Sequence, residues 1–232
     1  MIPVLALGMA SVLAILCKPL RFLGAGAASG FASKALASSL FCAAGVAAAA
    51  QRDTFSLSAA ALLLAMLLAL TGDLLLAIEP ILEYPTRDRS FFFVMGALPF
   101  FLAHALNMAV LWYSAPFSVR MLLRALLSAF CWALLWLRGV WKPGAQGVAL
   151  LLYGTVLGAA MAAAVELCAV RVRLGVVVLP ASLAFIASDT ALFSAVFGRG
   201  RGCGWIKRHF SLCVMLPYYA AQALMALCIL WI

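Results

Sequence analysis

Long apolar runs separated by short polar breaks constrain the fold of this chain more than any other feature. About eight runs approach the roughly 20 residues that a bilayer core requires. In the bilayer core no water pairs with backbone groups, so a spanning chain forms helices or a closed barrel, and unbroken runs favour helices. We therefore predict an all-α integral membrane protein, a single bundle of about eight transmembrane helices, with residues 1–232 forming one polytopic membrane domain. The expected spans are 2–17, 31–50, 56–78, 90–113, 119–137, 146–169, 174–197 and 211–232.

Charge is scarce and unevenly distributed. Only 10% of the 232 residues are charged and 68% are hydrophobic, whereas a soluble domain keeps roughly a quarter of its residues charged. The net charge of +9 comes from Lys and Arg residues that lie almost entirely in the polar breaks. This pattern indicates membrane topology and contact with lipid headgroups, not nucleic-acid binding. The seven cysteines form no CxxC or His/Cys spacing, so neither a disulfide framework nor a metal site is indicated.

The positive residues also predict an orientation. Loops are numbered from the N-terminus, and the odd loops carry ten Lys or Arg residues against five in the even loops and their flanks. This bias places the odd loops in the cytoplasm and both termini outside. The runs "RDR" at 87–89 and "GRGRGCGWIKRH" at 198–209 are expected to be such positive loops. We expect an integral multi-pass protein of the bacterial inner (cytoplasmic) membrane. The ten residues are Lys18, Arg21, Arg87, Arg89, Arg138, Lys142, Arg199, Arg201, Lys207 and Arg208; the five are Arg52, Arg120, Arg124, Arg171 and Arg173.

Two aspartates lie inside apolar runs. Asp73 lies about six residues from the odd-loop end of its span, and Asp189 about nine, which is roughly 9 and 13 Å at the rise of a helix. A carboxylate in the bilayer centre costs about 3 kcal/mol on insertion scales. Each is either a structural pin that pairs across helices or a functional group. Two carboxyl groups in a low-dielectric cavity do not both ionise readily, which suits acid/base chemistry, so both are candidate catalytic residues.

Other polar residues are candidates for substrate binding. Lys34 is either an interfacial residue whose amino group reaches the headgroups or a partner for a phosphate or carboxylate. His104 and Asn107, at positions i and i+3, either join helices by hydrogen bonds or line a site. Glu166, just before two arginines, is expected at the membrane interface.

The last span and the residue before Asp189 complete this set. Tyr218 and Gln222 share a helix face at i and i+4, and either line a cavity or hold helices together. Pro217 is expected to bend the helix beside them. Ser188 and Tyr219 are the remaining candidates.

Several familiar catalytic patterns are absent from the sequence. It contains neither a GxSxG nucleophile elbow nor an HExxH zinc motif, and it has only two histidines. Any chemistry must therefore rest on carboxylates.

Five blocks of the sequence resemble one known family in the same order along the chain. They are "SKAL" (33–36), "TGDLLLAI" (71–78), "FFFVMGALPFFLAHALN" (91–107), "ASLAFIASDTALFS" (181–194) and "LPYYAAQALM" (216–225). The chain resembles the YhhN, or transmembrane protein 86, family, whose characterised members are lysoplasmalogenases. Ala35 stands where the family usually has proline, and Asn107 lies near a position where it often has tyrosine.

The resemblance implies hydrolysis of the sn-1 vinyl ether bond of lysoplasmalogens to a fatty aldehyde and a glycerophospho-base. It also implies that Asp73 and Asp189 are the catalytic acids, that no metal or organic cofactor is required, and that the partners are a lysophospholipid substrate in the bilayer and membrane lipids. A vinyl ether opens when its β-carbon is protonated, which requires a proton donor and a carboxylate that stabilises the resulting cation. The headgroup preference and the oligomeric state stay open.

Two other classes of function remain possible at this stage. A proton-coupled transporter of small molecules or lipids also uses paired intramembrane acids, as a proton relay. No internal repeat is evident, and the acids lie away from the midplane, which disfavours a transporter. A structural or lipid-binding membrane protein would tolerate replacement of both aspartates.

Overall fold

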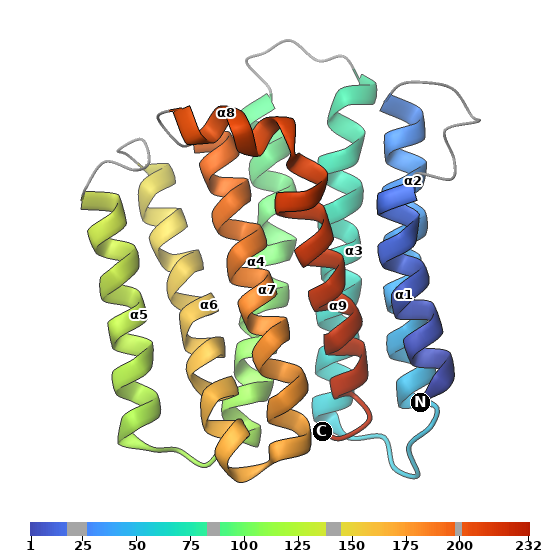
Figure 1. Cartoon of the computed structure of the whole chain (residues 1–232), viewed down its shortest axis with the longest axis vertical. Coiled ribbons are helices and arrows are strands. Elements are labelled where there is room, and N and C mark those ends of the chain that lie inside the picture. The colour runs from blue at the N-terminus through green and yellow to red at the C-terminus, as the bar shows by residue number, and fades with distance from the viewer. Residues whose placement is uncertain (18–26, 83–88, 138–144, 198–200) are drawn as a thin grey trace. The chain divides into compact units, whose positions relative to one another are not determined.

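Most of the residues that the structure describes are helical. A computed structural model of the chain describes residues 1–17, 27–82, 89–137, 145–197 and 201–232 (Figure 1). The helices are α1 (Ile2–Cys17), α2 (Ala27–Ala49), α3 (Leu57–Leu82), α4 (Arg89–Ser114), α5 (Val119–Leu137), α6 (Ala145–Val170), α7 (Val172–Phe197), α8 (Arg201–Arg208), the π-helix η2 (Ser211–Met215) and α9 (Leu216–Cys228).

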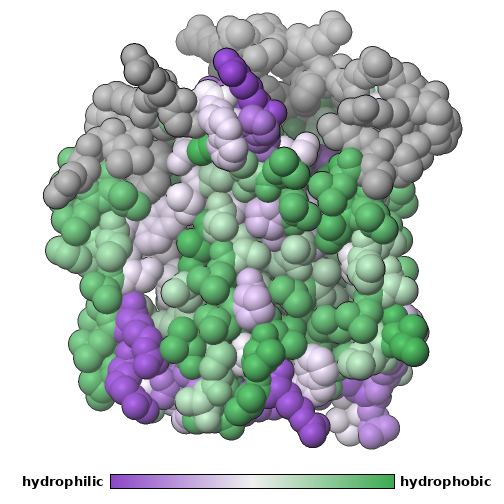
Figure 2. All heavy atoms as spheres, viewed as in Figure 1, coloured by the Kyte–Doolittle hydropathy of each residue, from purple (hydrophilic) through white to green (hydrophobic). Residues whose placement is uncertain are grey.

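The predicted spans agree with the long helices, and the predicted fold class is confirmed. Six described helices are long and apolar enough to cross a membrane, and α1 contributes a shorter apolar segment. The largest shifts are of four residues at helix ends: α2 begins at Ala27, earlier than expected, α3 runs further, to Leu82, and α9 ends earlier, at Cys228. Figure 2 shows hydrophobic residues over the middle of the helices on the visible face and hydrophilic residues near the helix ends. This is the surface of a multi-pass membrane protein.

Two helix starts follow directly from serine caps. The hydroxyl oxygen of Ser56 accepts a hydrogen bond from the backbone N–H of Ala59, and that of Ser118 accepts one from Met121, both over 3.1 Å. Each serine satisfies one of the backbone donors that a helix leaves unpaired at its start, which contributes about 1 kcal/mol. These caps define where α3 and α5 begin.

The segment 198–209 differs from the prediction. It was expected to be a positively charged loop, but residues Arg201–Arg208 form the short helix α8. The glycines and basic residues of "GRGRGCGWIKRH" favour a loop in a sequence reading, yet Cys203 and Ile206 lie on the side of the helix opposite Arg208, which stabilises a helix at a boundary between apolar and polar surroundings.

The expected irregularity at Pro217 lies one turn earlier. Residues Ser211–Met215 form a π-helix, in which the backbone N–H of Leu216 donates to the carbonyl oxygen of Ser211, five residues before it. Proline lacks the N–H that would close the next helical turn, and its ring crowds the carbonyl four residues back. The wider π turn accommodates this carbonyl at the start of α9.

The described residues group into two compact units. The first comprises Met1–Asn107 and Gln222–Ile232, and the second comprises Met108–Ala221. In the first unit, Arg52 donates a hydrogen bond of 2.6 Å to the carbonyl oxygen of Ile229, which pairs an otherwise open acceptor at the end of α9. The prediction of one polytopic domain stays a prediction.

In the second unit, α5 and α6 pack closely through two glycines. A Cβ on Gly154 would lie 2.2 Å from the indole of Trp132, and one on Gly158 would lie 1.8 Å from the hydroxyl oxygen of Ser128. Glycines four residues apart let two membrane helices approach closely, and the contact then rests on van der Waals packing. Next to this contact, Arg124 of α5 donates a 2.8 Å hydrogen bond to Glu166 of α6.

Glu166 differs in detail from the sequence reading. Its carboxylate is buried and pairs with Arg124 and, at 3.7 Å, with Arg120. The sequence reading placed Glu166 at the membrane interface, just before Arg171 and Arg173. Its ion-pair partners instead come from the neighbouring helix α5. A buried carboxylate with a charged partner avoids the large cost of an uncompensated charge.

Much of the topology prediction falls on residues that lie outside the described ones. These are Lys18, Arg21, Arg87, Arg138, Lys142 and Arg199. The cytoplasmic assignment of the odd loops and the bacterial inner membrane therefore stay predictions.

Candidate active site

Asp73 lies in the middle third of α3 and has a close polar partner on α2. Its side chain is buried, with 4% of its surface exposed. The hydroxyl group of Ser38 donates a hydrogen bond of 2.6 Å to Oδ2 of Asp73. A hydrogen bond between a hydroxyl and a carboxylate is short and stronger than one between neutral groups. It therefore fixes the carboxyl group against α2.

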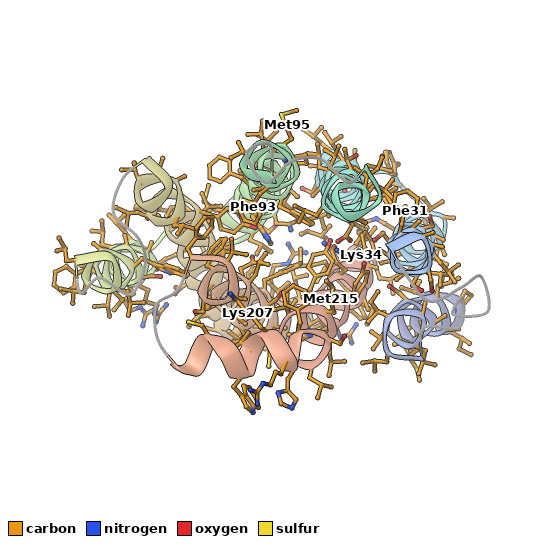
Figure 3. The ribbon with its side chains drawn as sticks, turned by 90° about the horizontal axis from the view of Figure 1, so that it is seen from above. Phe31, Lys34, Phe93, Met95, Lys207 and Met215 are labelled. Carbon is orange, nitrogen blue, oxygen red and sulfur yellow. The ribbon has the colours of Figure 1, made fainter. Side chains whose placement is uncertain are left out.

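Lys34 lies one turn before Ser38 on α2, and its ammonium group interacts electrostatically with Asp73. Figure 3, seen from above, shows Lys34 extending from α2 toward α3. Cys42, one turn after Ser38, donates from its thiol to the carbonyl oxygen of Met66 over 3.6 Å. Positions 34, 38 and 42 follow each other at i, i+4 and i+8, so one polar stripe of α2 faces the carboxylate.

Gly72, next to Asp73, provides a close contact with α4. A Cβ at this position would lie 2.7 Å from the ring of Phe100 and 3.0 Å from the carbonyl oxygen of Gly96. One turn further, a Cβ on Gly96 would lie 2.6 Å from the side chain of Leu76. Gly72 therefore allows α4 to approach closely, so that Asp73 lies on a helix packed against both α2 and α4.

Asp189 lies in the last third of α7 and is also buried, with 5% of its surface exposed. The phenol of Tyr153, on α6, donates a hydrogen bond of 3.2 Å to Oδ2 of Asp189. The ring of Tyr153 packs edge-on against Phe193 with centroids 5.0 Å apart, and Phe193 contacts Trp132 of α5 at 6.4 Å. Phe193, which itself packs against Trp132, therefore fixes the ring of Tyr153, and with it the phenol group that contacts the carboxylate.

Ser188 does not turn its hydroxyl to its neighbour Asp189. It donates a hydrogen bond of 2.9 Å to the carbonyl oxygen of Val214, in η2. A π turn leaves backbone carbonyls that the regular helix would pair, and a buried serine can satisfy one of them. Ser188 thus joins α7 to η2 beside Asp189.

The tyrosines of α9 form an aromatic cluster in the second unit. Tyr218 and Tyr219 are buried and pack edge-on with centroids 4.9 Å apart, and Phe185 of α7 contacts Tyr218 at 6.2 Å. Gln222 is buried one turn after Tyr218, and it belongs to the first unit.

His104 and Asn107 lie on α4 and are both buried, at 4% and 7% exposure. They belong to the first unit, as do Lys34 and Asp73. At i and i+3 they share one face of the helix. Their substrate-binding role stays a prediction.

The structure brings Lys34 together with Asp73, whereas Asp189 and Ser188 belong to the other unit. The pairing of the two aspartates in one site stays a prediction.

Two partners were missed in the sequence: Ser38 for Asp73 and Tyr153 for Asp189. The spacing of Ser38, one turn after Lys34, could have indicated the first. Tyr153 gave only a weak signal, as a phenol inside an apolar run. In the part of the chain that the structure describes, no group of three or more His, Cys, Asp or Glu side chains is placed to hold a metal ion.

The model of the YhhN family matches residues 13–229, which is nearly the whole chain. No curated protein matches the chain, and no solved structure does.

Proposed function

The chain belongs to the YhhN family, and from this premise we propose that it hydrolyses the sn-1 vinyl ether bond of lysoplasmalogens. The products are a fatty aldehyde and a glycerophospho-base, the headgroup being choline or ethanolamine. The observation that carries the proposal is that two buried aspartates in apolar helices each accept a hydrogen bond from a hydroxyl donor on a neighbouring helix. Buried intramembrane carboxylates are costly, and such groups most often serve a function.

The reaction needs one proton donor and one base. We assign the proton to Asp189, which adds it to the β-carbon of the vinyl ether and produces an oxocarbenium ion. The carboxylate of Asp73 stabilises this cation and accepts a proton from the water molecule that attacks it. The resulting hemiacetal returns its hydroxyl proton to Asp189, while Asp73 protonates the glycerol oxygen as the C–O bond breaks. Both carboxyl groups then regain their starting protonation states. The net reaction converts the lysoplasmalogen and one water molecule into the aldehyde and the glycerophospho-base.

The surroundings of each aspartate support this division of roles. Asp73 has the short hydrogen bond from Ser38 and the ammonium group of Lys34 nearby. Both stabilise a carboxylate anion, the form that a base and a cation stabiliser require. Asp189 has a longer hydrogen bond, from the neutral phenol of Tyr153. We therefore assign the base to Asp73, which has a cationic side chain near it, and the proton to Asp189.

Other polar residues are assigned to the rest of the substrate in this proposal. In this proposal the alkenyl chain lies among apolar helices and the phosphate lies toward Lys34, whose ammonium group can pair with it. His104, Asn107, Tyr218, Tyr219 and Gln222 complete the binding residues, and Ser188 supports Asp189 through its bond to Val214.

The test is product analysis with the purified full-length protein. The protein is incubated in detergent with a lysoplasmalogen and, separately, with an ester lysolipid of the same headgroup. We expect aldehyde from the first and no fatty acid from the second. In D₂O the aldehyde should carry one deuterium on the carbon next to its carbonyl, because that carbon accepts the catalytic proton. Turnover of neither lipid would contradict the proposal and favour the proton-coupled transporter.

A further inference from the structure

A second group of residues lies at the end of α8 and just after it, and it takes no part in the proposed hydrolysis. Lys207, Arg208 and His209 are exposed, and Trp205 is 60% exposed. Trp205, Arg208 and His209 share one side at i, i+3 and i+4, and Lys207 lies on an adjoining side. We call the surface formed by these four residues the α8 basic face. The rings of Trp205 and His209 stack at a centroid distance of 4.7 Å with an interplanar angle of 30°. Nδ1 of His209 also lies 3.1 Å from the carbonyl oxygen of Trp205, so the two rings are held together at the surface.

The charge of this face is not balanced by the sequence around it. No residue from 190 to 232 is Asp or Glu, whereas Lys207 and Arg208 follow two further arginines at 199 and 201. An unbalanced basic cluster creates a positive potential that attracts anionic groups. The face therefore has the chemistry of a surface that binds phosphate-bearing partners.

The position of α8 identifies which partner is available. Figure 1 shows α8 lying across the end of α7 instead of continuing its direction, and both helices belong to the same unit. Helix α7 is an apolar helix of 26 residues, about 39 Å long at 1.5 Å per residue, which exceeds a bilayer core of about 30 Å. The end of α7 thus lies at a membrane surface, and α8 runs along that surface.

The size and composition of the face argue for lipid over protein. A stable protein interface covers about 800 Å² on each partner, whereas this face extends over less than two helical turns and has one exposed indole. Tryptophan is enriched at the level of lipid headgroups, and Lys and Arg beside a membrane attract anionic lipids. We propose that the α8 basic face binds the headgroups of anionic phospholipids.

This contact has a consequence for depth in the membrane. Headgroups bound to α8 hold the end of α7, at Phe197, at the level of the headgroup layer. Asp189 lies eight residues before Phe197 on the same helix, which places its Cα about 12 Å below that level. The basic face therefore sets the depth of this carboxylate, whether or not the chain is a hydrolase.

The experiment uses the fluorescence of Trp205 in the purified full-length protein. Subtracting the emission of Trp205→Phe from that of the wild type isolates this indole. Phosphatidylglycerol and, separately, phosphatidylcholine are titrated into the protein in detergent. We expect phosphatidylglycerol to shift the difference emission and phosphatidylcholine to leave it unchanged. The response should weaken as salt is added, because the attraction is electrostatic.

Two double variants separate this face from charge in general. Lys207→Gln/Arg208→Gln removes two charges from the face, and Arg171→Gln/Arg173→Gln removes two exposed arginines at the other end of α7. Each basic residue near an anionic surface contributes about fivefold in affinity, so we expect the first variant to raise the half-saturating phosphatidylglycerol concentration by at least about fivefold. The second should leave it unchanged. Circular dichroism and gel filtration check that both variants fold.

Three results would overturn the proposal. One is an equal response to both lipids, and another is an unchanged phosphatidylglycerol titration for Lys207→Gln/Arg208→Gln. The third is a Trp205 signal that follows protein concentration instead of lipid, since this would identify the face as a contact between copies of the chain.

Discussion

The hydroxyl group of Ser38 lies 2.6 Å from Oδ2 of Asp73 and joins α2 to α3 at the carboxylate. In the proposed reaction this hydrogen bond orients the base and stabilises its anion. Ser38 is itself fully buried, so water does not compete for its hydroxyl group. The bond therefore acts at close to its full strength.

Replacement of Ser38 by alanine should slow the reaction more than it weakens substrate binding. Hydrogen bonds to charged groups contribute about 1.5–3 kcal/mol, so we expect kcat for aldehyde release to fall about tenfold or more, with a smaller change in KM. The neighbouring Ser39 is exposed on the same helix and provides the matched control. Ser39→Ala should retain wild-type kcat. An equal loss in both variants would show that the effect is on α2 as a whole and not on Asp73.

Tyr153→Phe removes the phenol oxygen that contacts Asp189 but keeps the ring that packs on Phe193. The helices should therefore stay folded, and the melting temperature should change little. We expect kcat to fall about threefold to tenfold, because a neutral hydrogen bond contributes about 1 kcal/mol. Tyr113 is 86% exposed, and Tyr113→Phe serves as the control, with unchanged kinetics. Wild-type kcat in Tyr153→Phe would exclude the phenol from the site.

Lys34→Met tests whether the ammonium group binds the phosphate of the substrate. If Lys34 contacts the phosphate, the substitution should raise KM for an alkenyl glycerophospholipid about tenfold, because one charge-assisted hydrogen bond is lost. It should leave KM for an alkenylglycerol without phosphate unchanged. An equal effect on the two substrates would instead mean that Lys34 acts only through Asp73, with which it interacts.

Gly175→Ala tests the packing of the turn between α6 and α7. A Cβ at this position would lie 2.4 Å from both the backbone nitrogen and the Cα of Cys168, and backbone atoms cannot move aside as a side chain can. Overpacking of this kind costs about 1–3 kcal/mol, and the melting temperature should fall by several degrees. Gly30 has open space around its Cα, so Gly30→Ala should not lower the melting temperature. An unchanged melting temperature in Gly175→Ala would contradict the close packing of this turn.

The long helices were predictable because the bilayer fixes their length and composition. The run at 56–78, for example, needs no tertiary contact to be recognised, since about 20 apolar residues with few charges fit a membrane core. Helix α8 was not predictable in the same way. Its glycines and charges are typical of a loop, and its helical form depends on the boundary at which it lies.

The candidate site was predictable only in its charged members. Asp73 and Asp189 stand out because an intramembrane charge is costly. Ser38 and Tyr153 do not stand out, because neutral hydroxyl groups are common in membrane helices and cost little there. Which helix a hydroxyl faces depends on the tertiary packing, as the bond from Ser188 to Val214 shows. The sequence alone therefore does not indicate which neighbouring helix a hydroxyl group contacts.

The rate of aldehyde release by Asp73→Asn and Asp189→Asn tests the central claim most directly. Asparagine keeps the size of the side chain but can neither supply the catalytic proton nor accept one as a base. Asp53 is exposed in the turn before α3, and Asp53→Asn controls for the substitution itself. With a purified lysoplasmalogen as substrate, both intramembrane variants should lose at least about a hundredfold in kcat, while Asp53→Asn should retain wild-type activity. Wild-type aldehyde release by both Asp73→Asn and Asp189→Asn would contradict the account.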